Sequence, residues 1–139
     1  MKPLVVDASA AAGWLLRQQS NPRSDAFLER RLATMKVAPD IFNWEIINLL
    51  RVNAERRVID FDVTMTDLDS LGIDTVEPRG RRKMRELALF ALQTRLSLFD
   101  AAYLALAVEL DGEIVSRDAS LLNAAARLGV AHYDIRAIQ

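Results

Sequence analysis

The chain has 139 residues, of which 51% are hydrophobic and 27% are charged, and its formal net charge is −1 at pH 7. This composition is typical of a globular domain with a sizeable core, and no apolar run is long enough to cross a bilayer. We therefore expect a single domain over residues 1–139 and no membrane partner. The lack of cysteine, and of a secretory signal in the opening MKPLVVDAS, favours a cytoplasmic protein.

The composition also excludes several kinds of active site. Without cysteine there is no thiol nucleophile and no thiolate zinc site. The only histidine, His132, rules out a multi-histidine metal cage and argues against a Ser-His-Asp triad. The five glycines are scattered, so no phosphate-binding glycine loop is present. Carboxylates remain the main candidate chemistry, and they favour hard cations such as Mg²⁺ or Mn²⁺.

In the first half of the chain, short apolar runs alternate with helical patterns. Asn21 followed by Pro22 is typical of a helix start, and Asp40 is expected to cap a long helix. The patterns predict, in order, a strand at Leu4-Val5-Val6, a helix through Ala10, Trp14 and Leu15, a helix from Pro22 carrying Phe27, Leu28, Leu32 and Met35, a strand at Val37-Ala38, a helix from about Ile41 to Arg57 and a helix around Val63 to Leu71.

Three glycines, Gly72, Gly112 and Gly129, divide the second half, and each is expected to be the left-handed residue that ends a helix. Strands separated by helices need crossover connections, which are right-handed and build a parallel sheet covered on both faces. We therefore expect an α/β protein with a three-layer α/β/α fold. The predicted strands here are Ile73 to Val76, Ile114-Val115 and Val130 to Tyr133, and the predicted helices are about Arg81–Arg95, Leu98–Leu110 and Ala119–Leu128.

Four acids stand out by position: Asp7, Glu45, Asp100 and Asp118. Asp7 follows the first strand directly, and Asp118 follows the Ile114-Val115-Ser116 strand in the same way. Ligands of open parallel sheets lie beyond the carboxyl ends of the strands, and the first strand is a natural centre of the sheet. If these two strands are neighbours, their acids share one crevice.

Each acid also has a simpler explanation. Asp7 and Asp118 could cap the helices that follow them, and Ser97 with Asp100 matches a capping box. Glu45 lies among apolar neighbours on its helix, where burial without a partner is costly. Its alternatives are a position at the rim of the core or an ion pair with Arg56.

Convergence of the four acids would create an electrostatic conflict. Two like charges about 4 Å apart repel by roughly 4 kcal/mol at an effective dielectric near 20. A divalent cation would resolve that conflict, and a cation held by oxygen ligands can catalyse phosphate chemistry. Ser9 and Ser116 are secondary candidates: Ser9 could donate to Asp7 or hold a metal-bound water, and Ser116 lies beside Asp118. Both could instead form only local backbone hydrogen bonds. Arg79, Arg81, Arg82, Lys83 and Arg85 form a basic run that suits either phosphate contact or a solvated helix start.

The ordered set of motifs V-V-D-A-S-A, P-D-x-x-x-x-E, S-L-F-D-A-A-Y-L-A-L-A and I-V-S-R-D-A-S-L resembles the PIN domain. The size of the chain and its D-A-A-Y-L-A-L-A segment resemble, more narrowly, the VapC-type toxins of type II toxin–antitoxin systems. The resemblance implies an α/β/α fold, a homodimer, Mg²⁺- or Mn²⁺-dependent endoribonuclease activity on RNA, and inhibition by a VapB-type antitoxin.

The resemblance also implies residue roles. Asp7, Glu45, Asp100 and Asp118 correspond to the family's catalytic and metal-binding acids. Ser9 and Ser116 occupy positions where the family often has Ser or Thr. The chain departs from the family at Arg117, where a small or neutral residue is common, which leaves the metal geometry open.

Two alternative hypotheses about the function remain, each from a different class of protein. In an aspartyl-phosphate phosphatase or receiver-like domain, the acid after the first strand is itself phosphorylated, but such a site needs a basic partner at a later strand end. In a non-enzymatic partner-binding α/β module, the acids are only helix caps. The aromatic residues Trp14, Phe27, Phe42 and Trp44 then either pack in the core or contact the partner.

Overall fold

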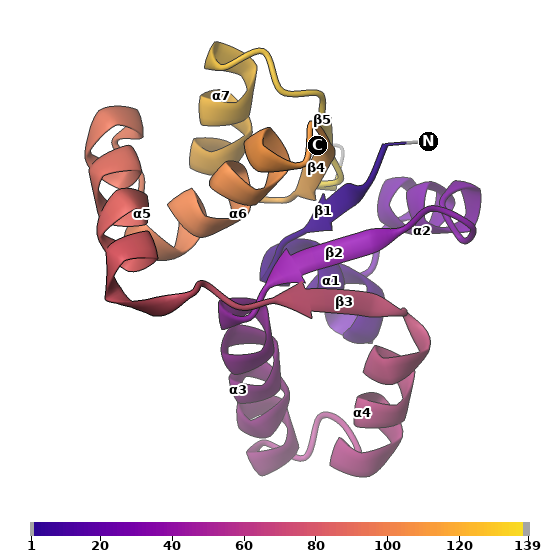
Figure 1. Ribbon diagram of the computed structural model, residues 1–139. Coiled ribbons are helices and arrows are strands. Elements are labelled where there is room, and N and C mark those ends of the chain that lie inside the picture. Colours follow the sequence, from indigo (N-terminus) through magenta and orange to yellow (C-terminus); the bar gives the residue numbers. More distant parts are fainter. Residues whose placement is uncertain (1, 138–139) are drawn as a thin grey trace.

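The computed structural model describes residues 2–137, and a parallel sheet lies at the centre of this part of the chain (Figure 1). The five strands of the sheet are ordered β3-β2-β1-β4-β5, so β1 is the central strand, as predicted. The strands are β1 (Leu4–Val6), β2 (Lys36–Pro39), β3 (Ile73–Val76), β4 (Glu113–Ser116) and β5 (His132–Asp134). All neighbouring strands run parallel, and Val6 of β1 is in register with Val115 of β4.

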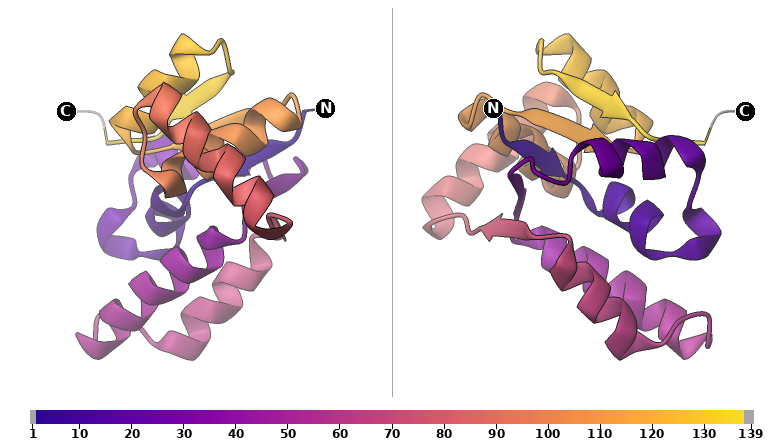
Figure 2. Two further views of the ribbon diagram at one scale, coloured as in Figure 1. Left: turned by 60° about the vertical axis from the view of Figure 1, so that its left-hand side comes forward. Right: turned by 90° about the vertical axis from the view of Figure 1, so that its right-hand side faces the viewer.

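Helices cover both faces of the sheet, which confirms the three-layer α/β/α fold. On one face α6 packs against β1, β2 and β4, α7 packs against β4 and β5, and α5 lies on α6; on the other, α1 packs with α2, α3 and α4 (Figure 2). The helices are α1 (Ala8–Leu15), α2 (Pro22–Arg30), α3 (Ile41–Glu55), α4 (Phe61–Ser70), α5 (Gly80–Thr94), α6 (Leu98–Glu109) and α7 (Ala119–Arg127), with a short 3₁₀ turn η1 (Arg17–Gln19) after α1.

The core lies between β1 and the two helices α1 and α6. The three residues of β1 are fully buried, as expected for a strand covered on both faces. Tyr103 and Leu104 of α6 are also buried, and α6 is apolar on nearly every side because the sheet, α5 and α7 all contact it. In the described residues, no helix is both long and apolar enough to span a membrane.

Two predictions around β2 were wrong. Helix α2 ends at Arg30, so Leu32 and Met35 lie beyond it and are largely exposed. The chain turns here because Lys36 enters the sheet, and its Nζ donates to the carbonyl oxygens of Arg31 and Thr34 at 2.8 and 3.2 Å. Asp40 makes no capping hydrogen bond with its side chain, because its own backbone is already helical, whereas a capping residue is extended.

The glycine predictions were partly confirmed. Gly72 and Gly129 have φ of +64° and +70°, as a left-handed residue at a helix end requires. Gly112 does not, and the left-handed residue after α6 is Asp111. A Cβ at Gly112 would lie 2.7 Å from the carbonyl oxygen of Pro3, so glycine is needed there for a close backbone approach beside β1.

Candidate active site

Asp7 lies at the carboxyl end of the central strand and is almost fully buried. Its Oδ1 accepts hydrogen bonds from the backbone N–H of Ala10 at 2.9 Å and from the hydroxyl of Ser9 at 2.8 Å. Its Oδ2 accepts from the hydroxyl of Ser116 at 2.5 Å. Asp7 is therefore the N-cap of α1, as the simpler explanation predicted. The same carboxylate also accepts a hydrogen bond from Ser116, the last residue of β4.

The hydroxyls of Ser9 and Ser116 join the segments that follow β1 and β4. Ser116 Oγ also accepts from the backbone N–H of Asp118 at 2.9 Å, and Ser9 Oγ accepts from that of Arg117 at 2.9 Å. The carboxylate of Asp118 caps α7 by accepting from the N–H of Ser120 at 3.0 Å. The structure thus uses both serines to orient Asp7, while a direct role toward a cofactor stays a prediction.

Asp100 enters the site from the first turn of α6. Its backbone N–H donates to Ser97 Oγ at 3.1 Å, so Ser97 is the N-cap that the capping box predicted. The Asp100 side chain is half-buried, which raises its pKa, and the nearby carboxylate of Asp118 raises it further.

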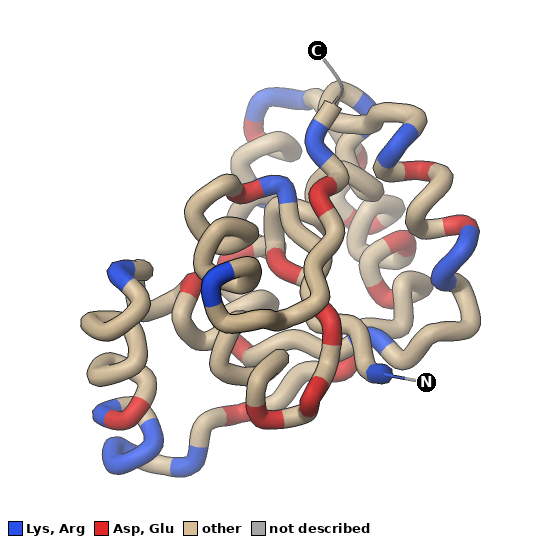
Figure 3. The backbone as a smooth tube through the Cα atoms, turned by 90° about the horizontal axis from the view of Figure 1, so that it is seen from above, with Lys and Arg blue, Asp and Glu red and all other residues tan. Residues whose placement is uncertain are grey.

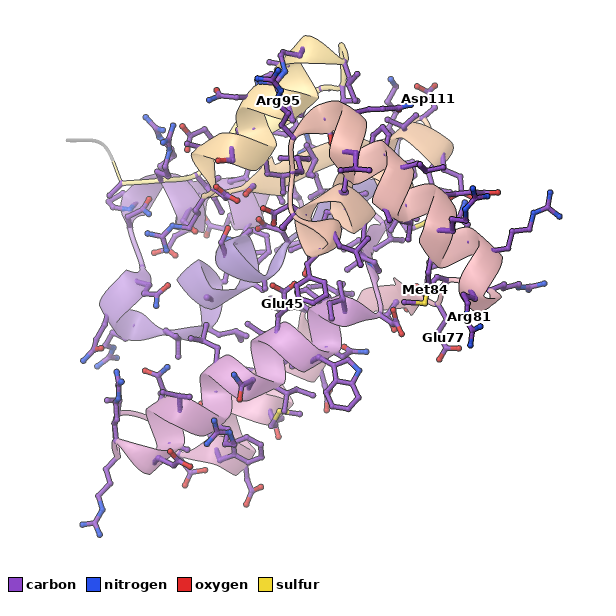
Figure 4. The ribbon with its side chains drawn as sticks, turned by 90° about the vertical axis from the view of Figure 1, so that its left-hand side faces the viewer. Glu45, Glu77, Arg81, Met84, Arg95 and Asp111 are labelled. Carbon is purple, nitrogen blue, oxygen red and sulfur yellow. The ribbon has the colours of Figure 1, made fainter. Side chains whose placement is uncertain are left out.

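Glu45 is half-buried on α3 and points toward α6 (Figure 4). The hydroxyl of Tyr103, on α6, donates to Glu45 Oε1 at 2.7 Å. Within residues 2–137, no ion pair joins Glu45 to Arg56, so the expected alternative pairing is absent there. Sequence reasoning missed Tyr103, although a residue one turn after Asp100 on the same helix lies on the same face.

The pKa values show that these acids lie within each other's electrostatic field. Burial raises the pKa of Asp7 from 3.8 to about 6, and the charge of Asp100 adds to the rise. Hydrogen bonds from Ser116, Ala10 and Ser9 act in the opposite direction and lower the pKa. Burial also raises the pKa of Asp100 to about 6, and Asp118 and Glu45 act in the same direction. In the described residues, none of the main contributions to either shift comes from a basic side chain.

The donor set has the chemistry for a hard divalent cation, but it does not form a closed cage. Within residues 2–137, no three His, Cys, Asp or Glu side chains are grouped so that they could hold a metal ion as they stand. A closed cage is not what Mg²⁺ requires, because this ion usually binds through one or two carboxylates and keeps several waters. Oxygen donors that repel one another, as Asp7, Asp100 and Asp118 do, fit such an ion.

The raised pKa of Asp7 predicts that the metal-free protein loses stability as pH rises. Because the folded state holds this proton more tightly, the stabilisation is complete below about pH 3.8 and is lost as pH passes about 6. The shift corresponds to on the order of 2–3 kcal/mol. Urea unfolding in chelator, from pH 4 to 7, should show this loss relative to Asp7→Asn. Parallel pH profiles for the two proteins would contradict it.

A groove of about 670 Å³ lies between α3, α5 and α6, and none of the four acids lines it. Trp44 and Phe99, which precede Glu45 and Asp100 in the sequence, line it and are 76% and 51% exposed. The basic run 79–85 surrounds the start of α5, where blue segments gather at one end of the molecule (Figure 3). Lys83 of this run pairs with Glu109 at 3.6 Å. A contact between the run and RNA stays a prediction.

Comparison with known proteins supports the fold. A model of the PIN domain matches residues 4–127. No curated protein matches the chain. Among solved structures, PAE2754 from Pyrobaculum aerophilum has a TM-score of 0.69 at 20% identity, with 94% of this chain and 83% of that one covered.

Two other solved structures share the architecture. FitAcB from Neisseria gonorrhoeae has a TM-score of 0.67 at 17% identity, covering 94% of this chain and 96% of that one. A PilT N-terminus domain protein, SSO1118, from Sulfolobus solfataricus P2 has a TM-score of 0.53 at 16% identity, covering 96% and 87%. At such identities the likeness concerns the fold alone. The family model, by contrast, spans most of the chain, from β1 through α7, and shows that the protein belongs to the PIN domain family, whose members are generally nucleases.

Proposed function

We propose that the protein is a metal-dependent endoribonuclease that hydrolyses RNA phosphodiester bonds and is the toxin of a VapBC-type system. The observation that carries the proposal is the electrostatic coupling of the four acids: in addition to burial, the charge of Asp100 raises the pKa of Asp7, and Asp118 and Glu45 raise that of Asp100. No basic side chain is among the main contributions to these two shifts. These acids come from the ends of β1 and β4 and from α3 and α6. We also propose that residues 1–139 form one domain.

In this proposal each acid has a distinct task. Asp7, Asp100 and Asp118 would hold one or two Mg²⁺ or Mn²⁺ ions, some through water, and Glu45 would hold a second ion or orient the attacking water. When bound, the ion would lower the pKa of a coordinated water and stabilise charge on the phosphate. Ser9 and Ser116 keep both oxygens of Asp7 in place through hydrogen bonds of 2.8 and 2.5 Å.

The proposed partners are a second copy of the chain and a VapB-type antitoxin, in the cytoplasm. They follow from the motif resemblance, and the apolar groove between α3, α5 and α6 supports a protein contact on that face. Besides Trp44 and Phe99, Met84 lines the groove and is 49% exposed. Exposed apolar residues that gather in one groove are typical of an interaction surface.

The phosphoryl-acceptor alternative is weakened by the positions of the three lysines. Lys2 lies near Asp111 at 3.6 Å, and Lys83 lies near Glu109 at 3.6 Å. Lys36 is buried with its Nζ on backbone carbonyls. No lysine therefore accompanies Asp7, where a receiver-like site would need one.

A cleavage assay on a mixed RNA pool tests the proposed function. We expect the parent protein to cleave RNA with Mn²⁺, and cleavage to fall to background with excess chelator or in Asp100→Asn. The Asp100→Asn variant should keep its circular-dichroism spectrum, since Ser97 still caps α6 through the backbone N–H of residue 100. Cleavage that persists in chelator, or no cleavage with any divalent ion, would refute the proposal.

A further inference from the structure

Tyr103 joins the core of the protein to the acidic site. It lies on α6 three residues after Asp100, and only 1% of the residue is exposed. Its hydroxyl donates to Glu45 Oε1 at 2.7 Å, and in residues 2–137 no other side chain hydrogen-bonds Glu45. A buried tyrosine normally satisfies its hydroxyl with some partner, and here the partner is one of the four acids.

The same hydroxyl also responds to the start of α1. Burial raises the pKa of the Tyr103 hydroxyl, the charge of Asp7 adds to the rise, and the backbone N–H of Ala8, the residue after Asp7, lowers the pKa. One phenol group from α6 therefore hydrogen-bonds Glu45 on α3 and lies within the electrostatic field of Asp7. Its ring is held in the core, so the position of the hydroxyl is fixed by packing.

We propose that Tyr103 is a positioning residue, which holds the Glu45 carboxylate toward the other acids and leaves Glu45 Oε2 to face the cation or the attacking water. The inference rests on the proposed function, because it assigns Glu45 a task in catalysis. A hydrogen bond donated to a metal-binding side chain by a residue that does not itself bind the metal typically contributes 10- to 100-fold in metal affinity or activity.

A purely structural role for Tyr103 makes different predictions. If only the ring matters, Tyr103→Phe keeps the packing and changes neither kcat nor Mn²⁺ affinity. The chain offers a matched control in Tyr133, whose hydroxyl donates to Glu113 Oε2 at 2.6 Å in the β4–β5 region. Tyr133→Phe removes the same type of hydrogen bond where none of the four acids is involved.

The test compares Tyr103→Phe with Tyr133→Phe in two assays, RNA cleavage kinetics and Mn²⁺ titration of the RNA-free protein by electron paramagnetic resonance. We expect Tyr103→Phe to lower kcat about 10- to 100-fold with KM little changed, and to weaken Mn²⁺ binding measurably. Tyr133→Phe should do neither. In a Glu45→Ala background, Tyr103→Phe should cause no further loss, because it acts through Glu45.

Parent values of kcat and Mn²⁺ affinity in Tyr103→Phe would overturn the inference, as would an equal further loss in the Glu45→Ala background. A failure of the proposed function has a different signature, because the parent protein itself would then not cleave RNA. In that case the Mn²⁺ titrations alone decide: weaker binding in Tyr103→Phe than in Tyr133→Phe upholds the positioning role, and equal binding overturns it.

Discussion

Asp7→Asn is expected to reduce RNA cleavage about a thousandfold while the protein stays folded. Asparagine has almost the same shape, and its oxygen can still accept from the N–H of Ala10, so the cap of α1 is kept. What is lost is a negative charge at the carboxyl end of the central strand. Charge stabilisation by a catalytic metal is worth several kcal/mol, and about 4 kcal/mol corresponds to a thousandfold in rate.

Asp60→Asn is a matched control for this variant. Asp60 is also an N-cap, of α4, and its carboxylate accepts from the N–H of Val63 at 2.9 Å, but it is exposed and away from the four acids. The same substitution there should leave cleavage unchanged. Initial rates on one RNA substrate with Mn²⁺ measure both variants, and an Asp7→Asn protein that cuts at the parental rate would end the assignment of Asp7.

Local sequence patterns predicted most of the fold because its elements are bounded by local signals. The apolar run at β1, the Asn21-Pro22 start of α2 and the glycines after α4 and α7 act within a few residues of themselves. The central place of β1 followed from topology rather than propensity, since a first strand has both sides free. All of these predictions were confirmed.

The predictions that were wrong concern contacts with distant segments. Glycine is needed at position 112 because the backbone of Pro3 approaches it closely, and the chain turns after α2 where Lys36 begins β2 and donates to the carbonyl of Arg31. The residue pattern of a single helix contains no information about either contact. Asp40 has a residue type that favours capping, but its position directly after β2 gives it a helical backbone instead.

The same division applies to the site. The sequence indicated which acids lie at helix starts, and Asp7 shows that a helix cap can also be a buried carboxylate whose pKa another acid raises. The partner of Glu45 was not predictable, because Arg56 is closer in sequence than Tyr103, and only the packing of α3 beside α6 decides between them. The balance of burial and repulsion that raises two pKa values likewise depends on all the elements together.

Phe42→Ala is expected to destabilise the protein by about 3–5 kcal/mol, a large share of the 5–15 kcal/mol typical of a native domain. Phe42, Ile46 and Leu50 form the buried stripe of α3, and Phe42 is only 1% exposed. Removing its ring leaves a cavity beneath α3, the helix that carries Glu45. The loss in the free energy of unfolding therefore includes both the transfer free energy of the ring and the cost of the cavity. Urea unfolding at constant pH in chelator measures the change.

Trp44→Ala is the control, because it removes a larger aromatic side chain from the same helix. Trp44 is 76% exposed, so the free energy of unfolding should change by roughly 0.5 kcal/mol or less. From the sequence, both aromatic residues were expected either in the core or at a partner surface. The structure buries Phe42 and exposes Trp44. Equal losses in the two variants would mean that α3 does not pack through its Phe42 face, and the orientation of Glu45 toward Tyr103 would then lack its support.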